Sequence, residues 1–411
     1  MSHRVVGGVI VAVVVLAFIV GGGPGPTTPL APEAVHAQGA AKYMGVATCG
    51  ASNCHGSTKA KPDFPKMNES VIWLQKDHHS KAYAALTNPK GKAGTIATNL
   101  KIAKAESSDR CLSCHALNAK PEQRGPKFDV TEAVQCEVCH GAAEKWLDSH
   151  SEKGWTHEQS VKAGMYDTKN ILLRAEKCVS CHLAIDANMV AAGHPDLTAF
   201  ELDTFSGQMP PHWRDKGTWA GPRAWAVGQV MSLREAARQL GDRAAGNASG
   251  AALNDALAKV QGHGAMVRMI MATAAPDAQK SVEGDVATLT DAVAKGDKAR
   301  IGASAKNLQA TMQAQASKVA AREPDQASTK KLLSDISAGG DAIGATGLRA
   351  AEQAGMALDR LYSAYSKAPG VKTDPASSKA LDAIFATLED PKKYDAKSFA
   401  AATKSFNETL K

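Results

Sequence analysis

Eight cysteines fall in four pairs, and a histidine follows the second cysteine of every pair. Three pairs have the spacing C-x-x-C-H, and the first has the wider spacing C-x-x-x-x-C-H. With 13 histidines in 411 residues, chance fills all four positions with histidine at a probability of about 10⁻⁶. The residues are Cys49, Cys54 and His55; Cys111, Cys114 and His115; Cys136, Cys139 and His140; and Cys178, Cys181 and His182.

This spacing is the attachment signature for c-type haem. Two thiols separated by two residues reach the two vinyl groups of one porphyrin as thioethers, and the adjacent histidine becomes the proximal ligand of the iron. The four-residue gap between Cys49 and Cys54 makes a wider loop that reaches the same two positions. The sequence therefore predicts four covalently bound haems.

Two other chemistries fit part of this pattern. The second and third cysteine pairs could form a four-cysteine zinc ribbon, and four disulfides could form in an oxidising compartment. Neither explains why a histidine follows each pair, and a zinc ribbon leaves Cys49 and Cys54 without a matching pair. Haem attachment accounts for all of these cysteines and histidines.

Each iron needs a second ligand on its opposite face, and seven histidines remain outside the motifs and the N-terminal segment. We expect four of them to be distal ligands, which makes the haems bis-histidine and six-coordinate, as suits electron transfer. The expected distal ligands are His79, His150, His194 and His212, and the expected non-ligands are His78, His157 and His263.

Local sequence ranks these candidates. A helix expected over residues 68–87 places His79 on its inward stripe and turns His78 toward solvent. The glycine before His194 permits close approach to a ring, and Pro195 fixes the chain after it. His212 follows two prolines, which restrict its approach to an iron.

Four stretches resemble the cytochrome c-554 family of multihaem c-type cytochromes, and the resemblance spans roughly residues 40–230. It implies helical or irregular chain wrapped around haems, with bis-histidine ligation for most of them. It supports His79, His150 and His194 as distal ligands, and it implies that one of four haems lacks a strong distal ligand. The stretches are Tyr43-Met-Gly-Val-Ala-Thr-Cys49, Asp77-His-His-Ser-Lys-Ala-Tyr83, Val134-Gln-Cys-Glu-Val-Cys-His-Gly141 and Ala191-Ala-Gly-His-Pro-Asp-Leu-Thr-Ala-Phe-Glu-Leu202.

Residues 1–37 have the pattern of a secretory signal peptide. Arg4 precedes an unbroken run of apolar residues and glycines, and small residues favour cleavage after Ala37. Export to the periplasm or beyond fits the motifs, because c-type haem is attached outside the cytoplasm. An uncleaved segment would instead associate with the membrane, since residues 5–23 are barely long enough to span a bilayer.

The composition changes near residue 226. Residues 226–411 contain 44 alanines and neither cysteine nor tryptophan, and their apolar residues recur at helical spacing between prolines. The expected fold is mainly α, with a haem-packed cytochrome c domain over residues 38–225 that holds much irregular chain. An Ala-rich antiparallel bundle of five to seven helices follows over residues 226–411, in an interaction or capping role.

These features predict an electron carrier. The net charge of +7 comes without a basic block interleaved with aromatics, which argues against nucleic acid as a partner. The expected function is electron transfer between redox proteins, a donor and an acceptor, through a chain of mostly bis-histidine haems. The alternatives are an enzyme that acts on a small nitrogen or oxygen species at one open-coordinate haem, and a haem conduit that polymerises.

Overall fold

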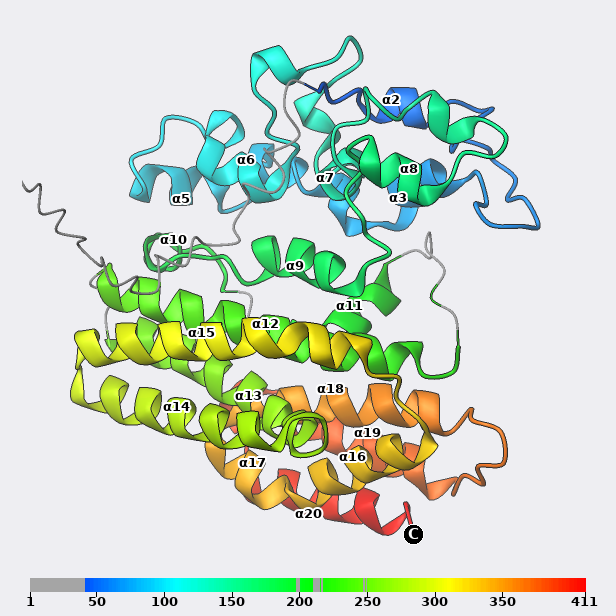
Figure 1. Cartoon of the computed structure of the whole chain (residues 1–411). Coiled ribbons are helices and arrows are strands. Elements are labelled where there is room, and N and C mark those ends of the chain that lie inside the picture. The colour runs from blue at the N-terminus through cyan, green and yellow to red at the C-terminus, as the bar shows by residue number, and fades with distance from the viewer. Residues whose placement is uncertain (1–40, 197–199, 210–214, 216, 247, 249) are drawn as a thin grey trace, which may run out of the picture.

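The protein has two layers of different character. The computed structural model describes residues 41–196, 200–209, 215, 217–246, 248 and 250–411. In Figure 1 an upper layer of short helices and irregular chain lies over a lower layer of long helices. The expected signal segment 1–37 and His212 lie outside the described residues. Among those residues no strand forms, and the extended pairing is one isolated parallel bridge between Tyr43 and Arg124. The mainly α fold class is confirmed.

The upper layer holds the first three cysteine motifs, and the chain that links the two layers holds the fourth. Its helices are short because glycines, prolines and Asx or Ser caps interrupt them every few residues. The elements are α2 (Val46–Cys49), α3 (Glu69–Lys76), η1 (His78–Lys81), α4 (Ala84–Thr87), α5 (Ala93–Asn99), η2 (Ala105–Ser107), α6 (Asp109–His115), η3 (Pro121–Gln123), η4 (Val130–Glu132), α7 (Cys136–His140), η5 (Ser149–Ser151), α8 (His157–Lys162), α9 (Ile171–His182), α10 (Ala187–Ala191) and α11 (Leu202–Gln208).

The helix expected over residues 68–87 is not continuous. It divides into α3, η1 and α4, because Asp77 adopts an extended conformation and its side chain accepts the His79 backbone N–H. This Asx cap begins a new turn and competes with continuation of α3. The expected outcome for the two histidines still holds, since His78 is exposed and His79 is half-buried.

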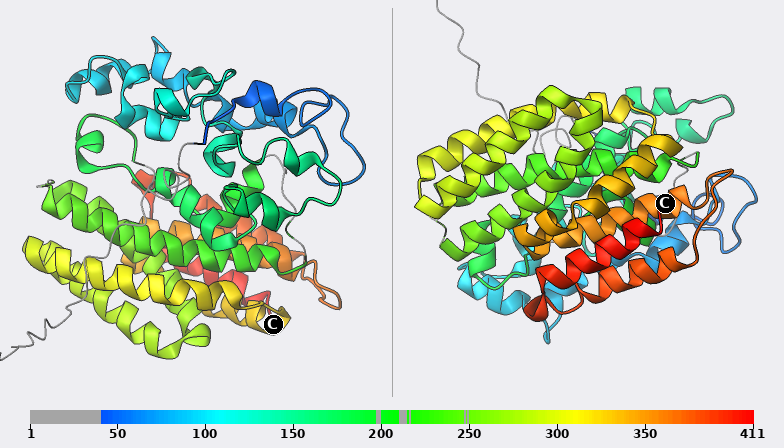
Figure 2. Two further views of the ribbon diagram at one scale, coloured as in Figure 1. Left: turned by 45° about the horizontal axis from the view of Figure 1, so that its top comes forward. Right: turned by 90° about the horizontal axis from the view of Figure 1, so that it is seen from below.

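The lower layer is the expected helical bundle (Figure 2). Its described residues form nine α-helices instead of five to seven, in part because a glycine divides a stretch that apolar spacing alone reads as continuous. Gly339 separates α16 from α17 within the apolar pattern of Leu332, Ile336 and Ile343, and Gly347 lies between α17 and α18. The elements are α12 (Ala220–Ala245), α13 (Gly250–Ala274), α14 (Pro276–Lys295), α15 (Lys298–Ala321), α16 (Gln326–Ala338), α17 (Gly340–Thr346), α18 (Leu348–Tyr365), α19 (Ala376–Ala386), η6 (Pro391–Lys393) and α20 (Ala396–Glu408).

Helix α9 lies between the two layers (Figure 1). Ala175, Val179 and Leu183 recur every four residues and are buried in the same apolar cluster as α12 and the bundle. Cys178 of the fourth motif is partly buried against the same cluster. The fourth cysteine motif is therefore built on a helix that the bundle holds.

Helix α12 is the central element of the bundle. Most of its residues are buried, and it packs against α9 and α11 as well as α13, α15 and α18. The expected boundary between residues 225 and 226 falls inside this helix. The division into a cytochrome domain and a separate bundle domain stays a prediction.

Candidate haem sites

The cysteine motifs lie mostly on short helices, which explains their spacing physically. In a helix, positions i, i+3 and i+4 share one face. The two cysteines and the histidine of the second, third and fourth motifs occupy those positions at the ends of α6, α7 and α9. In the first motif Cys49 ends α2, and Cys54 and His55 follow in a turn.

Motifs that are distant in sequence lie beside each other. The Cys49 thiol is hydrogen-bonded to the Cys136 thiol, which lowers the pKa of Cys49 and raises that of Cys136. The Cys114 thiol is hydrogen-bonded in the same way to the Cys181 thiol. The first motif is thus adjacent to the third, and the second to the fourth. No disulfide joins any two of the eight cysteines.

A buried carboxylate fixes the first of these contacts. Glu137, inside the third motif, accepts backbone N–H groups from Met44 at 2.9 Å, Gly45 at 2.8 Å and Ala143 at 2.8 Å. Burial raises the pKa of the Glu137 carboxyl, while these donors oppose the shift. The side chain ties the chain before Cys49 to helix α7.

Three proximal histidines face a histidine from a different part of the chain. The ring centroids lie 6.2 Å apart for His55 and His150, and the rings are nearly parallel. They lie 6.2 Å apart for His115 and His194, and 6.0 Å apart for His182 and His79. Each pair joins one C-x-x-C-H histidine to one expected distal histidine.

These separations fit an iron between the rings. A ligating imidazole nitrogen lies about 2 Å from its metal and roughly 1 Å from the centre of its own ring, so two axial imidazoles on one iron have centroids about 6 Å apart. The porphyrin supplies the other four ligands. Accordingly, among the described residues, no group of three or more His, Cys, Asp or Glu side chains is arranged to hold a metal ion by itself.

Few apolar side chains are buried together around the first three motifs. Among the described residues, the main apolar cluster belongs to the bundle and α9. The upper layer has two small clusters of five buried residues each. Porphyrin rings between the paired histidines would supply apolar surface that the side chains of this layer do not.

In five of the six paired histidines, Nδ1 forms a hydrogen bond with an acceptor oxygen. The acceptor is a carboxylate for two of them: Glu69 accepts from His55 at 2.9 Å, and Asp77 accepts from His79 at 3.0 Å. Because these oxygens accept, Nδ1 carries the proton and Nε2 keeps its lone pair for a metal. Backbone carbonyls serve the other three: Ala82 for His115 at 2.9 Å, Leu147 for His150, and Pro195 for His194 at 2.8 Å.

The sixth paired histidine, His182, has an apolar environment. Its ring stacks on Phe200 at 5.0 Å and meets the edge of Phe205 at 5.3 Å. Burial, with a smaller effect of His79, lowers the pKa of His182 to about 4. At neutral pH the ring is therefore neutral, which is the form that binds metals.

The remaining histidines have other partners. His157 bonds Asp167 through Nε2 at 2.8 Å, and His263 is buried in the bundle, where its Nδ1 bonds Gln229 at 2.9 Å. His212, the fourth expected distal ligand, lies outside the described residues, and His140 is the C-x-x-C-H histidine that remains outside the three pairs. The assignment of His212 stays a prediction.

Residues 48–141 match the family model for cytochrome c554 and c-prime. This segment includes the first three cysteine motifs and ends directly after His140, whereas the fourth motif and the bundle lie beyond it. No curated protein and no solved structure gave a match. The match supports the resemblance drawn from the sequence, and cytochromes of this kind bind c-type haem covalently and transfer electrons.

Carboxylates are the site residues that sequence reasoning missed. Asp77 had a usable signal, since an Asx residue two positions before His79 is a typical helix cap. Glu69 lies 14 residues from His55, and Glu137 contacts residues more than 90 positions away. No spacing rule connects such positions, so only the fold reveals them.

Proposed function

We propose that this protein is an exported tetrahaem electron carrier. Each cysteine motif holds one haem through two thioethers, and the following histidine binds the iron. His150, His194 and His79 are the distal ligands for the haems of His55, His115 and His182 respectively. The observation that carries the proposal is the set of three histidine pairs separated by 6.0–6.2 Å.

The motif contacts support a continuous electron path. The first motif touches the third, and the second touches the fourth. Cys139 of the third motif is also close enough to Cys178 of the fourth for its charge to act there: burial and then the charge of Cys139 raise the pKa of Cys178 to about 12. The order of the haems along the path is accordingly first, third, fourth and second.

The chain's own residues tune the irons, and the haems supply the redox chemistry. A carboxylate bonded to Nδ1 makes an imidazole a stronger donor and stabilises the oxidised iron, and a carbonyl does so less. The His55 and His182 haems each have one carboxylate-bonded histidine, whereas both histidines of the His115 haem bond carbonyls. We expect the His115 haem to have the highest potential of the three.

The distribution of charge indicates the kind of redox partner. Residues 42–127 contain 14 lysines and arginines against six aspartates and glutamates. This excess surrounds the first two motifs, at the two ends of the proposed path. We propose that the donor and acceptor dock through acidic surfaces, so that electron transfer slows as the salt concentration rises.

The expected signal peptide supports export, and the route of haem attachment requires it. The described part of the chain contains no helix that is both long enough and apolar enough to cross a membrane. Whether residues 1–37 are cleaved can be read from the N-terminal sequence of the purified protein.

The first test is the haem content of protein produced with a c-type haem attachment system. The intact mass should equal that of the chain plus four haems, and no free thiol should remain. A smaller haem number, or about one zinc per chain, would overturn the proposal. The second test is the variant His150→Ala, which should open one iron and let the reduced protein bind carbon monoxide at one additional haem.

The matched control is His157→Ala. This histidine also lies in a short helix of the upper layer, but its Nε2 is committed to Asp167. Its removal should leave the visible spectrum and carbon monoxide binding unchanged. An unchanged spectrum for His150→Ala, or the same change in both variants, would refute the assignment of His150.

A further inference from the structure

The chain between α9 and α11 carries the distal histidine His194 and lies where the two layers meet. The upper layer holds this stretch at two points: the side chain of Asn99 donates to the Ala192 carbonyl at 3.0 Å, and Arg110 pairs with Asp186 at 2.6 Å. Neither contact falls on the residues that follow His194.

The bundle holds the residues directly after His194. Asp196 receives the Arg243 guanidinium of α12 at 3.0 Å and the Lys259 ammonium of α13 at 2.5 Å. The exposed fractions of the side chains are 1% for Arg243, 0% for Lys259 and 11% for Asp196. One carboxylate thus serves two buried cations, and no other acid pairs with either cation among the described ion pairs.

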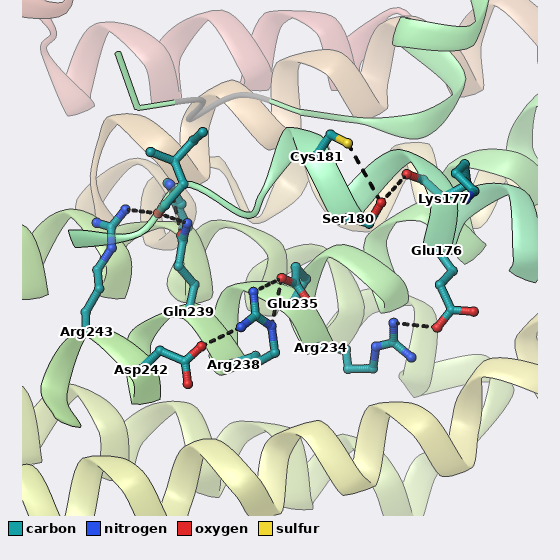
Figure 3. A network of polar contacts seen from close by, with 12 residues as sticks. Glu176, Lys177, Ser180, Cys181, Arg234, Glu235, Arg238, Gln239, Asp242 and Arg243 are labelled. Carbon is teal, nitrogen blue, oxygen red and sulfur yellow. Dashed lines mark hydrogen bonds and ion pairs between the residues drawn. The ribbon is translucent and has the colours of Figure 1, made fainter. Parts of the chain in front are cut away.

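The same cations fix the start of the stretch. The Ile185 carbonyl accepts from Gln239 at 2.6 Å and from Arg243 at 3.1 Å, and Lys259 donates to Gln239 at 3.1 Å. Figure 3 shows that Gln239 and Arg243 extend from α12 toward the layer of α9. Arg243 therefore bonds both ends of the segment 185–196, with α10 and His194 between them.

We propose that Arg243 and Lys259 are positioning residues for the haem at His115, and that they act on its distal ligand through Asp196. The inference rests on the proposed function, because it requires a haem between His115 and His194. His194 follows α10: its backbone N–H donates to the Met189 carbonyl at 2.9 Å, and its Nδ1 bonds the Pro195 carbonyl at 2.8 Å. Both α10 and His194 lie between Ile185 and Asp196, which the bundle holds, so the distance of His194 from His115 depends on where these two residues are held.

If Arg243 and Lys259 position His194, the bundle supports an axial ligand and is part of the haem site. A cap could be joined to the cytochrome layer through α9 alone, where Arg234 already pairs with Glu176 (Figure 3). The Asp196 contacts add a connection to one axial ligand. Loss of the carboxylate leaves two buried cations without a counter-charge, and this displaces the loop that carries His194.

The test is Asp196→Asn in the full-length holoprotein. We expect the bond between His194 and the iron to weaken about 10- to 100-fold, as for other residues that support a metal ligand. Part of one low-spin signal should then become high-spin in the oxidised protein, and one further haem should bind carbon monoxide after reduction. Asp196→Glu, which restores the charge, should recover most of the parental spectrum.

Asp203→Asn is the matched control. Asp203 lies in α11, nine residues after His194, and pairs with Arg360 of the bundle at 2.8 Å. The substitution therefore removes the same charge from another ion pair between the α9–α11 region and the bundle. It should leave carbon monoxide binding at the parental level. Should Asp196→Asn fail to fold, Lys259→Gln replaces it, because it keeps the pair of Asp196 with Arg243 and should give a smaller change in the same direction.

Haem counting separates the two proposals. A parental protein without four haems would refute the proposed function. A parental protein with four haems, together with a folded Asp196→Asn or Lys259→Gln variant whose spectra and carbon monoxide binding match the parent, would refute the positioning role. Equal effects of Asp196→Asn and Asp203→Asn would refute it as well.

Discussion

Replacement of Glu137 by glutamine should destabilise the protein far more than its conservative chemistry suggests. The Glu137 side chain is 1% exposed and receives three backbone N–H groups. An amide keeps the oxygen that serves Met44 and Ala143, but it turns an NH₂ group toward the Gly45 N–H. Two donors then face each other in a buried site, and each unsatisfied donor costs about 1–3 kcal/mol.

The backbone at Gly45 cannot easily shift to separate the two donors. Gly45 has φ of +84°, and a Cβ atom there would lie 2.2 Å from the Lys127 carbonyl oxygen, so the backbone is packed closely on its other side. We therefore expect Glu137→Gln to lower the free energy of unfolding by about 2–4 kcal/mol. The assay is urea unfolding of the holoprotein, followed by far-ultraviolet circular dichroism.

Glu144→Gln is the control for this experiment. Glu144 also accepts a backbone N–H, from Lys42 at 2.9 Å, but its side chain is exposed and water can replace the bond. We expect a loss below about 0.5 kcal/mol. If Glu137→Gln costs no more than Glu144→Gln, the carboxylate does not hold the first motif against the third as described.

Three further predictions follow from other contacts. Burial raises the pKa of Glu201 to about 7, so the native carboxyl stays protonated at pH values where the unfolded one ionises. Its contribution to stability should fall by roughly 3 kcal/mol as the pH rises from about 4.5 to 7, and unfolding titrations of Glu201→Gln should lack this part of the slope. Glu69→Gln should raise the potential of the His55 haem by on the order of tens of millivolts in a spectroelectrochemical titration, and an unchanged potential would contradict the role of the Glu69 bond. Deletion of residues 230–411 removes Arg243, Lys259 and most of the cluster on which α9 packs, so this chain should fail to give the parental spectrum; a folded truncation with that spectrum would show that the bundle is dispensable.

The cysteine motifs could be recognised from the sequence because their rule is local. Two cysteines and a histidine within five or seven residues define a haem motif without any knowledge of the fold. The bundle was predictable for a similar reason, since apolar spacing and prolines such as Pro276 and Pro324 mark helices directly. The helix count was wrong because Gly339 and Gly347 interrupt a pattern that periodicity reads as continuous.

The distal half depended on contacts that spacing cannot give. Helical periodicity selected His79 over His78, and the structure brings His79 to His182, even though the expected helix breaks at Asp77. Which motif each distal histidine faces was beyond the sequence, because His79 lies before the second motif and yet faces the fourth. The role of Asp196 was hidden for the same reason, since its two cations lie 47 and 63 residues away.

The most direct test of the account is the electron paramagnetic resonance spectrum of the oxidised holoprotein, with the spins of each species quantified. Three histidine pairs at 6.0–6.2 Å predict at least three low-spin ferric haems per chain, and the expected role of His212 predicts a fourth. Fewer than three low-spin haems in a protein that carries four would contradict bis-histidine ligation by these pairs.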